Sequence, residues 1–203
     1  IITHLPGTIF VPETEAWRDL VIQIHGDRLS RHQRIDFSNE KLDMDRLREF
    51  QNRVPEGFEV KRIDMDSVRQ LGYNMDKTYL YPMRMRDLIE HGIGFWAIAE
   101  NRWVSMAYSY VICKRGIEIE IDTRPDFRRK GLATCVGAAL IVHCLERGLE
   151  PHWSAANSIS AALAEKLGYV RCDSYECMVP EFRLSPDLQK VGYLPSQVER
   201  SAT

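Results

Sequence analysis

The stretch from Ile117 to Leu140 joins a strand pattern, a charged turn and a helix pattern, and it limits how the rest of the chain can fold. Apolar and acidic residues alternate from Ile117 to Asp122, which is the period of a half-buried strand. Pro125 cannot donate to a strand ladder and favours an extended conformation at Arg124, so we expect the strand to end there. Apolar and small residues then recur at helical spacing, at Leu132, Ala133, Val136, Gly137, Leu140 and Cys144.

The turn between this strand and this helix predicts an anion site. Gly131 has no Cβ, so a ligand can approach its backbone, and the first amides of a helix have no internal partner. The helix dipole adds positive potential at this end, and Arg128, Arg129 and Lys130 add full charges. The alternative is a solvated turn. Basic residues are unfavourable beside the positive end of a dipole, however, so their clustering here indicates a compensating phosphate or pyrophosphate.

Two blocks of sequence then carry a resemblance to a known family. Arg128-x-x-Gly131-x-Ala133 resembles the [RQ]xxGx[GA] acetyl-coenzyme A loop of the GCN5-related N-acetyltransferase (GNAT) superfamily. Downstream, residues 151–157 (PHWSAAN) with Ser160, followed by residues 164–169 (AEKLGY), resemble the superfamily's fifth strand, its Asn-led helix and its closing KLGF signature.

The run from about residue 92 to about residue 171, with Ser105 in its first part, is most similar to one bacterial branch of this superfamily. That branch contains zwittermicin A resistance acetyltransferases. The part of the chain before this run fits the branch more loosely.

The resemblance implies acetyl-CoA as co-substrate, held by two segments. Backbone amides from Arg129 to Thr134 would cradle the pyrophosphate. Main-chain groups of Ile121 and Thr123 would pair with the pantetheine arm, where the superfamily's fourth and fifth strands splay apart. Asn157 and Ser160 would bind the same arm or the thioester region. The expected coenzyme-binding residues are therefore Ile121, Thr123, Arg128, Arg129, Lys130, Gly131, Leu132, Ala133, Thr134, Asn157 and Ser160.

For the general base, Glu118 is the first candidate and Glu120 the second. Both lie on the strand that leads to the coenzyme loop, and a carboxylate can remove an amine proton directly or through water. The alternative is that both are solvent-facing strand carboxylates. A bulge in the strand would change which of the two points inward.

The general acid is where the sequence departs from the superfamily pattern. Many members have a tyrosine just before the EKLGF-like segment, and Ala164 stands there in this chain. Tyr169, Tyr175, Ser160 or water could replace it. His152 could serve as a base, although a lone histidine at a strand start is more often structural, and Trp153 is expected in the core.

Composition narrows the function classes. The chain has 203 residues, with 44% hydrophobic and 28% charged content, as is ordinary for a globular protein. Its net charge of −2 gives no general attraction to nucleic acid or anionic membrane, so neither is expected as a partner. No apolar run approaches the roughly 20 residues that span a bilayer and no signal pattern is present, so a cytoplasmic protein is expected. It starts with Ile1, so upstream residues can be missing.

The five cysteines are odd in number and include no CxxC spacing. A zinc site or a disulfide framework is therefore not expected, and no metal is predicted. Reduced and mostly buried thiols are the expectation.

The N-terminal segment, residues 1–57, is expected to be mainly helical. A helix would start at Glu13 or Thr14 and end near Gly26, and Ser38 would cap a second helix that ends before Pro55. Residues 27–39 are rich in charge and are interpreted as a solvated connector, with a second phosphate patch or substrate rim as the alternative. The apolar face of the first helix would consist of Trp17, Leu20, Val21 and Ile24.

Residues 58–180 are expected to form the catalytic core, followed by a tail at 181–203. Residues 94–99 and 103–113 would form an antiparallel meander with the Ile117 strand. One face of the meander would carry Ser105, Ala107 and Ser109, and the other Val104, Met106, Tyr108 and Tyr110. The fold class is thus α/β, and by resemblance the GNAT fold: a mixed, mostly antiparallel sheet flanked by helices, after a mainly helical N-terminal segment.

The expected activity is transfer of the acetyl group of acetyl-CoA to an amine of a small molecule, by direct attack in a ternary complex. The alternative is a GNAT-like module that binds acyl-CoA or a partner protein without turnover. Transfer of a longer acyl group differs only in pocket size. The resistance relatives suggest an aminated natural product as acceptor, and the sequence leaves a homodimer open.

Overall fold

The computed structural model describes residues 9–75, 79–80 and 83–180. The predicted tail at 181–203 lies outside the described residues. The elements, in chain order, are α1 (Glu15–His25), η1 (Gly26–Arg28), β1 (Leu29–Ser38), α2 (Met44–Asn52), β2 (Glu59–Arg62), α3 (Met65–Gln70), β3 (Tyr79–Leu80), β4 (Met83–Arg84), α4 (Met85–His91), β5 (Gly94–Ala99), β6 (Arg102–Ile112), β7 (Gly116–Thr123), η2 (Pro125–Phe127), α5 (Leu132–Leu145), β8 (Glu150–Ala155), α6 (Ser158–Leu167) and β9 (Val170–Pro180).

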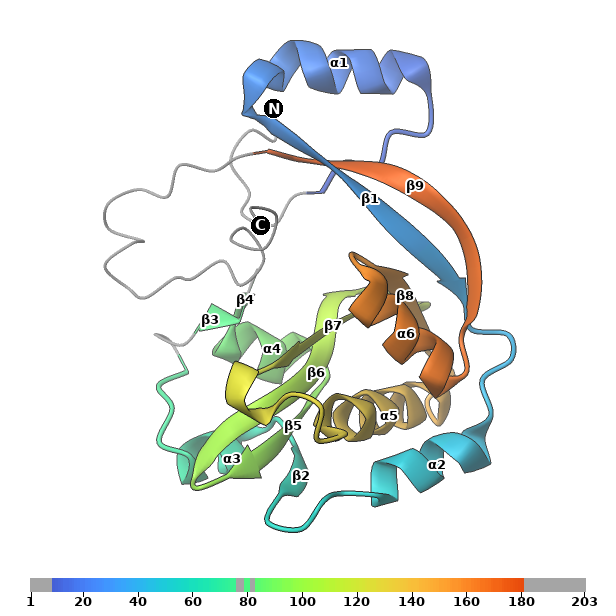
Figure 1. The fold of residues 1–203 in the computed structure, drawn as a ribbon. Helices are drawn as coiled ribbons and strands as arrows, with labels where there is room; N and C mark the ends of the chain where they lie inside the picture. The colour runs from blue at the N-terminus through green and yellow to red at the C-terminus, as the bar shows by residue number, and fades with distance from the viewer. Residues whose placement is uncertain (1–8, 76–78, 81–82, 181–203) are drawn as a thin grey trace.

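Seven strands form one sheet in the order β2-β5-β6-β7-β8-β1-β9, and β3 and β4 form a separate two-stranded sheet (Figure 1). In the large sheet β7 and β8 are parallel, while the other neighbouring strands are antiparallel. The predicted α/β class with a mixed, mostly antiparallel sheet flanked by helices is therefore confirmed, and so is the meander of β5, β6 and β7.

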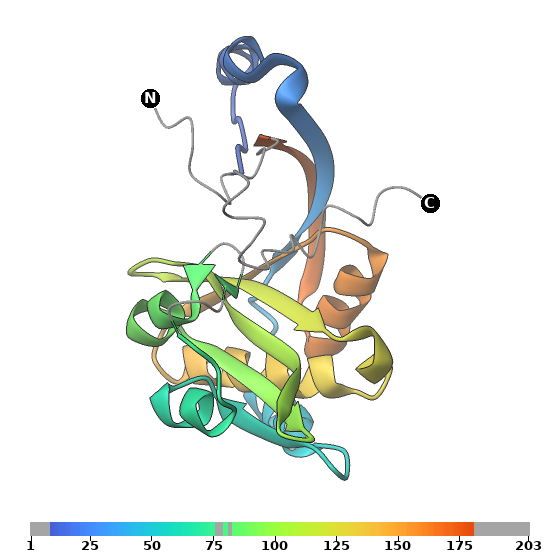
Figure 2. The same ribbon diagram turned by 90° about the vertical axis from the view of Figure 1, so that its left-hand side faces the viewer.

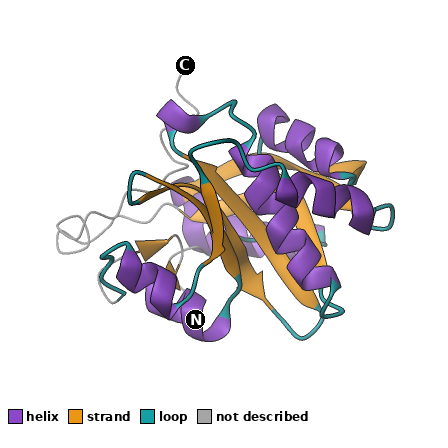
Figure 3. Cartoon of the chain, turned by 90° about the horizontal axis from the view of Figure 1, so that it is seen from below, coloured by secondary structure: helices purple, strands orange, loops and turns teal. Residues whose placement is uncertain are grey.

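Helices cover both faces of this sheet (Figure 3). The buried side chains form a separate core on each face. On one side α5 packs against the strands, with α2 and α6 beside it, in a cluster that includes Val136, Leu140 and Trp153. The core of the other face includes Val68 of α3 and Leu88 of α4, with Trp96 and Met106 from the sheet.

Helix α5 is apolar all round, and nearly all of it is buried between the sheet and the neighbouring helices. Gly137 allows this close packing, because a Cβ at this position would lie 3.1 Å from Ile121 Cδ1 on β7 and 3.3 Å from Leu167 Cδ1 on α6. The packing fixes the N-terminus of α5 against the end of β7.

The sequence-based interpretation of residues 27–39 as a solvated connector is wrong, because Leu29–Ser38 form β1. Its first half pairs only with β9. Ile35 and Phe37 pair with both β9 and β8, and Asp36, at a bulge between them, pairs with β8 alone. In Figures 1 and 2, β1 and β9 extend as a two-stranded arm with α1 across its far end. Arg31, His32 and Gln33 are exposed on this arm, so polar side chains are tolerated in the strand and hide its pattern.

Two further details of the N-terminal segment differ from the prediction. Asp43, rather than Ser38, caps α2, and its side chain accepts hydrogen bonds from the amides of Asp45 and Arg46. Helix α1 begins after Thr14 as expected, but of its apolar face only Val21 is buried. Trp17, Leu20 and Ile24 are exposed, because α1 lies on the arm and away from the main core.

One predicted strand face is also wrong. Val104 packs in the same core cluster as Ala107, while Met106 and Tyr108 pack in the other. The pairing of β5 with β6 jumps from Ala97↔Ser105 to Ile98↔Trp103, so Val104 is the extra residue of a β-bulge. A bulge breaks the period of two on which the prediction rested.

Candidate functional site

Strands β7 and β8 run side by side for only part of their length. They pair at Gly116↔Glu150, Ile117↔Pro151 and Glu118↔His152, whereas β7 continues to Thr123. Beyond this point β8 pairs with β1 on its other side. The two strands therefore part immediately after Glu118.

The backbone of β7 beyond this point has polar groups directed toward the gap. The amide of Arg124 donates to Val104 O on β6, so the alternate residues Glu120 and Asp122 also direct their main-chain groups to β6. Ile121 and Thr123 direct theirs to the side from which β8 has departed. The carbonyl of Thr123 accepts a 3.2 Å hydrogen bond from Arg128 Nε. These are the two residues that the resemblance assigns to the pantetheine arm.

The loop after β7 leads directly into the N-terminus of α5. Its backbone includes two residues with positive φ, Arg129 at 59° and Gly131 at 83°. Gly131 is the N-cap residue of α5, and a Cβ added to it would meet no atom within 4 Å. The glycine is thus required by its left-handed backbone, and the space in front of it is open.

Five consecutive amides of this loop, from Arg129 to Ala133, make no hydrogen bond with any part of the chain that the structure describes. The next two amides, of Thr134 and Cys135, donate to the carbonyl of Gly131 at 3.0 and 3.2 Å. The free donors therefore start two residues before the N-cap and end in the first turn of the helix. Such donors at the positive end of a helix dipole suit a phosphate oxygen.

Four basic residues belong to this loop or contact the first turn of α5: Arg128, Arg129, Lys130 and Lys166. The Lys130 ammonium lies 5.1 Å from the ring centroid of Phe127 and 5.8 Å from that of Phe58, and Lys166 Nζ donates to Thr134 Oγ1 at 3.1 Å. Within residues 9–75 and 83–180, neither these two lysines nor Arg128 and Arg129 form a salt bridge. An anion at the loop would compensate their charge.

Asn157 and Ser160 lie at the start of α6, and both have structural partners. Asn157 caps the helix, because its Oδ1 accepts from the amide of Ser160 at 2.9 Å. Ser160 Oγ accepts from the indole nitrogen of Trp153 at 3.2 Å. Trp153 is buried and packs against the ring of Tyr169, so its expected place in the core is confirmed.

Glu118 is held by hydrogen bonds at both carboxylate oxygens. His152 Nδ1 contacts Oε2, and the hydroxyl of Ser154 donates to Oε1 at 2.7 Å. The same hydroxyl accepts from Arg34 Nε at 3.0 Å, and His152 Nε2 lies 3.1 Å from Asp36 Oδ1. The hydrogen bond with Glu118 and the two nearby carboxylates raise the pKa of His152 above its ordinary value, while burial opposes this rise.

The sequence brought Glu118 and His152 into consideration, but Asp36 and Arg34 were missed because their strand was missed. The alternation of Arg34, Ile35, Asp36 and Phe37 was the available signal. Glu120, the second candidate base, lies two residues further along β7, opposite Tyr108 of β6, and is half-buried.

The candidate general acids differ in their accessibility. The Tyr169 hydroxyl is buried and donates to the Pro151 carbonyl at 2.7 Å, and burial raises its pKa well above the ordinary value. Ala164 is fully buried in α6. Tyr175 is half-buried on β9, opposite Arg34.

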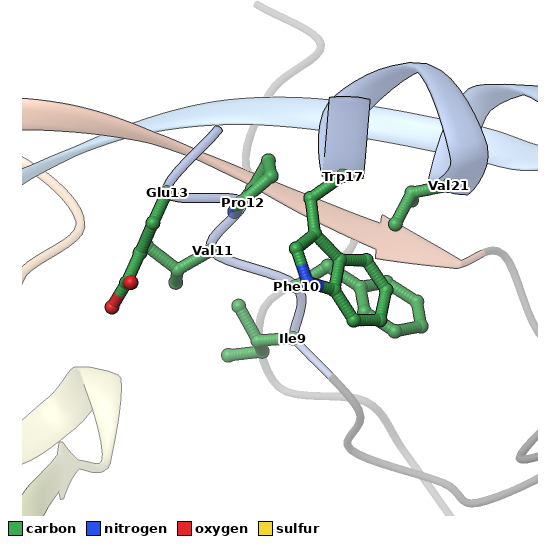
Figure 4. Close-up of a pocket in the computed structure, with 7 residues that line it drawn as sticks. All are labelled: Ile9, Phe10, Val11, Pro12, Glu13, Trp17 and Val21. Atoms are coloured by element: carbon green, nitrogen blue, oxygen red, sulfur yellow. The ribbon is translucent and has the colours of Figure 1, made fainter. Parts of the chain in front are cut away.

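The described residues include no group of three or more side chains that could hold a metal ion, and no helix among them is long and apolar enough to cross a membrane. One pocket of about 240 Å³ lies between α1 and the segment before it, lined by Phe10, Trp17 and Val21 among others (Figure 4). Another, of about 280 Å³, lies at the start of α3. Neither includes the loop before α5.

Comparison with known proteins agrees with this geometry. The family model described as GNAT acetyltransferase matches residues 4–178. The chain is similar to an uncharacterized N-acetyltransferase, YdfB, of Bacillus subtilis, with 28% identity over 165 residues, which is 80% of this chain. The chain spans 62% of the length of that relative.

Solved structures give the same result. A GCN5-related N-acetyltransferase-like protein from Streptococcus suis superposes with a TM-score of 0.69 at 34% identity, over 84% of this chain and 70% of that one. An acetyltransferase of the GNAT family from Novosphingobium aromaticivorans shares the fold, with a TM-score of 0.52 at 15% identity over 77% of this chain and 69% of that one. The chain belongs to the GNAT acetyltransferase family.

Proposed function

We propose that this protein transfers the acetyl group of acetyl-CoA to an amine of a small molecule, by direct attack in a ternary complex. The observation that carries the proposal is the run of amides without partners from Arg129 to Ala133, at the point where β7 and β8 have parted. The free amides can donate hydrogen bonds to a diphosphate. The exposed backbone of β7 can pair with the extended pantetheine arm.

The residues of the site fit the parts of this coenzyme. The amides of Arg129 to Ala133, with the charges of Arg128, Arg129 and Lys130, suit the pyrophosphate. The main-chain groups of Ile121 and Thr123 suit the amide groups of the pantetheine arm, which would add to β7 like a strand. Thr134 would contribute through its side chain, because its amide is already bonded to Gly131. In this proposal Asn157 and Ser160 line the far side of the gap.

An arm laid along β7 in this direction ends near Glu118. The amine nitrogen attacks the thioester carbonyl carbon, the carbon–sulfur bond breaks, and the coenzyme leaves as a thiolate that takes a proton from water. Glu118 is the proposed base for the ammonium proton, with Glu120 as the alternative. Each carboxylate oxygen of Glu118 has more than one acceptor site, so its existing hydrogen bonds leave room for the amine.

The acceptor is proposed to be a small molecule. The resemblance to zwittermicin A resistance acetyltransferases favours an aminated natural product. A cytoplasmic location and a homodimer are part of the same proposal, and gel filtration with light scattering would test the second.

A coenzyme-binding module without turnover is the rival, favoured by Ala164 at the usual tyrosine position. To separate the two, the protein is mixed with acetyl-CoA and spermidine, kanamycin or tyramine, and free CoA and acetylated amine are measured by mass spectrometry. The proposal predicts equal amounts of both products with at least one amine, and intersecting lines in initial-velocity plots. Coenzyme binding without turnover on any amine would favour the rival.

A further inference from the structure

Five polar side chains from three adjacent strands form one hydrogen-bonded chain across the sheet where β7 and β8 part. Glu118 of β7 and His152 of β8 lie opposite each other, as do Ser154 of β8 and Asp36 of β1. The order of contacts is Asp36, His152, Glu118, Ser154 and Arg34. This series of hydrogen-bonded side chains therefore connects the candidate base, Glu118, to β1 on the far side of β8.

The imidazole of His152 lies between two carboxylates, with Nδ1 toward Glu118 and Nε2 toward Asp36. Asp36 is itself oriented, since its Oδ1 also accepts from the amide of Phe37 at 2.9 Å. The protonated ring can donate to both carboxylates at once, whereas the neutral ring can donate to only one. The imidazole of His152 can therefore bind one additional proton next to Glu118.

The other groups around the ring do not supply a competing charge at contact distance. Arg34 of β1 is directed to the hydroxyl and carbonyl of Ser154, at 3.0 and 2.8 Å. The Tyr169 hydroxyl donates to the Pro151 carbonyl. The His152 side chain is 50% exposed, so one edge of the ring can exchange protons with water.

Resting on the proposed function, we propose that Glu118, His152 and Asp36 form a proton relay, in which the ammonium proton of the acceptor enters at Glu118 and ends on His152. In this relay Asp36 is a positioning residue that holds the ring through Nε2. Ser154 and Arg34 position Glu118 from the other side.

In the active form of the relay, the neutral ring of His152 carries its proton on Nε2. An N–H bond of the ammonium group breaks and its proton binds Glu118, which passes it to the lone pair of Nδ1. The amine lone pair then attacks the thioester. Of the two protons that the nitrogen loses, the first leaves His152 to water, and the second reaches the departing thiolate through water.

The relay predicts a direction for the dependence on pH. Because the neutral ring is the proton acceptor, kcat/KM rises with pH through the pKa of His152, which its carboxylate neighbours raise above the ordinary value. A general base works best when its pKa lies near the working pH, and imidazole meets this condition. Asp36→Asn removes one negative neighbour, so this limb should move to lower pH.

The first test reads the pKa of His152 directly in the whole protein. The ring signal is titrated by NMR and assigned among the six histidines by its absence in His152→Gln. Asp36→Asn should lower the pKa of His152, and Asp45→Asn, an exposed aspartate at the start of α2, should leave it unchanged. An unchanged pKa in Asp36→Asn would overturn the relay, whatever the activity of the protein.

The second test uses acetyl-CoA and whichever of spermidine, kanamycin and tyramine is acetylated. His152→Gln should lower kcat about 100-fold and abolish the ascending limb, with coenzyme affinity retained. Asp36→Asn should move the ascending limb of the pH profile to lower pH by the same amount as the change in the pKa of His152 that NMR measures. His32→Gln, an exposed histidine on β1, is the matched control and should behave as wild type.

The outcomes separate this inference from the proposed function. If the ascending limb of the pH profile of kcat/KM does not move in Asp36→Asn, or if His152→Gln has a normal kcat, the relay is wrong. The proposed acetyl transfer is not affected by either result. If the wild-type protein acetylates no amine, the proposed function and the relay both fall.

Discussion

Glu118 and His152 are the last residues at which β7 and β8 lie in register, and their side chains are in contact at that point. The two strands separate after this pair, and everything proposed for the site depends on that separation. Before it, the two strands are joined closely; after it, the backbone of β7 is open toward a ligand, and the loop before α5 has free amides. Glu118 and His152 therefore lie at the end of the gap between β7 and β8, and both belong to the hydrogen-bonded series of polar side chains that reaches β1.

Gly116 is required at the start of this parallel pair. A Cβ added to it would lie 2.1 Å from Glu150 O, which is a backbone atom that cannot move alone. Gly116→Ala should destabilise the protein by about 1–3 kcal/mol in urea unfolding and also weaken coenzyme binding, because the strands must separate. Gly72→Ala, with a positive φ of 69° but open space, should affect stability alone. Full stability in Gly116→Ala would contradict the observed strand contact.

Tyr169 is predicted to be structural. Tyr169→Phe removes the buried hydrogen bond to the Pro151 carbonyl and should cost about 1–2 kcal/mol of unfolding free energy. Its kcat should stay within about twofold of wild type, a change of less than 1 kcal/mol in the barrier, because the phenol does not reach the gap. Stopped-flow kinetics with thermal melts would check this, and a large loss of kcat at unchanged stability would assign Tyr169 to proton transfer.

Restoring the usual family tyrosine is expected to fail. Ala164 is fully buried, so Ala164→Tyr overfills the core and should lower the free energy of unfolding by about 1–3 kcal/mol without raising kcat. Ala162→Tyr, at an exposed position on the same helix, is the control for adding a ring. If Ala164→Tyr raised kcat without lowering the free energy of unfolding, residue 164 of α6 could present a side chain to the coenzyme, and this prediction would be wrong.

The cysteines should divide into two reactivity classes. Cys113 and Cys172 are exposed, while Cys135, Cys144 and Cys177 are buried. Burial raises the pKa of each buried thiol, and that of Cys144 to about 12, so these three stay protonated and unreactive. Titration with a chromogenic disulfide should show two fast equivalents in the native protein and the other three only in denaturant. A third fast thiol would show that the core opens readily.

The strand, the turn and the helix start between Ile117 and Ala133 could be predicted from sequence because all their signals are local. A strand, a proline turn and a helix start follow one another between Ile117 and Ala133, and their patterns do not depend on distant residues. Strand β1 could not be recognised in the same way. Its pairing with β9 joins Leu29 to Pro180, and the exposed polar residues Arg31, His32 and Gln33 hide its apolar pattern.

The missed strand explains the incomplete prediction of the site. Asp36 and Arg34 complete the surroundings of Glu118, and neither has a functional signal of its own. Likewise, the bulge at Val104 changes which side chains share a face of β6, and no feature of the local alternation announces it. Glu118 itself was within reach because its strand was recognised.

The most direct test of the central claim is acetyl-CoA binding by isothermal titration calorimetry to Gly131→Glu and Gly148→Glu. Both glycines have positive φ and open space beside them, so both variants have the same kind of backbone strain, but Gly148 lies beyond the other end of α5. A carboxylate at residue 131 would repel the diphosphate, so Kd should rise at least about tenfold, or roughly 1.4 kcal/mol, with Gly148→Glu near wild type. Equal affinity in wild type and Gly131→Glu would contradict the claim that this loop holds the coenzyme.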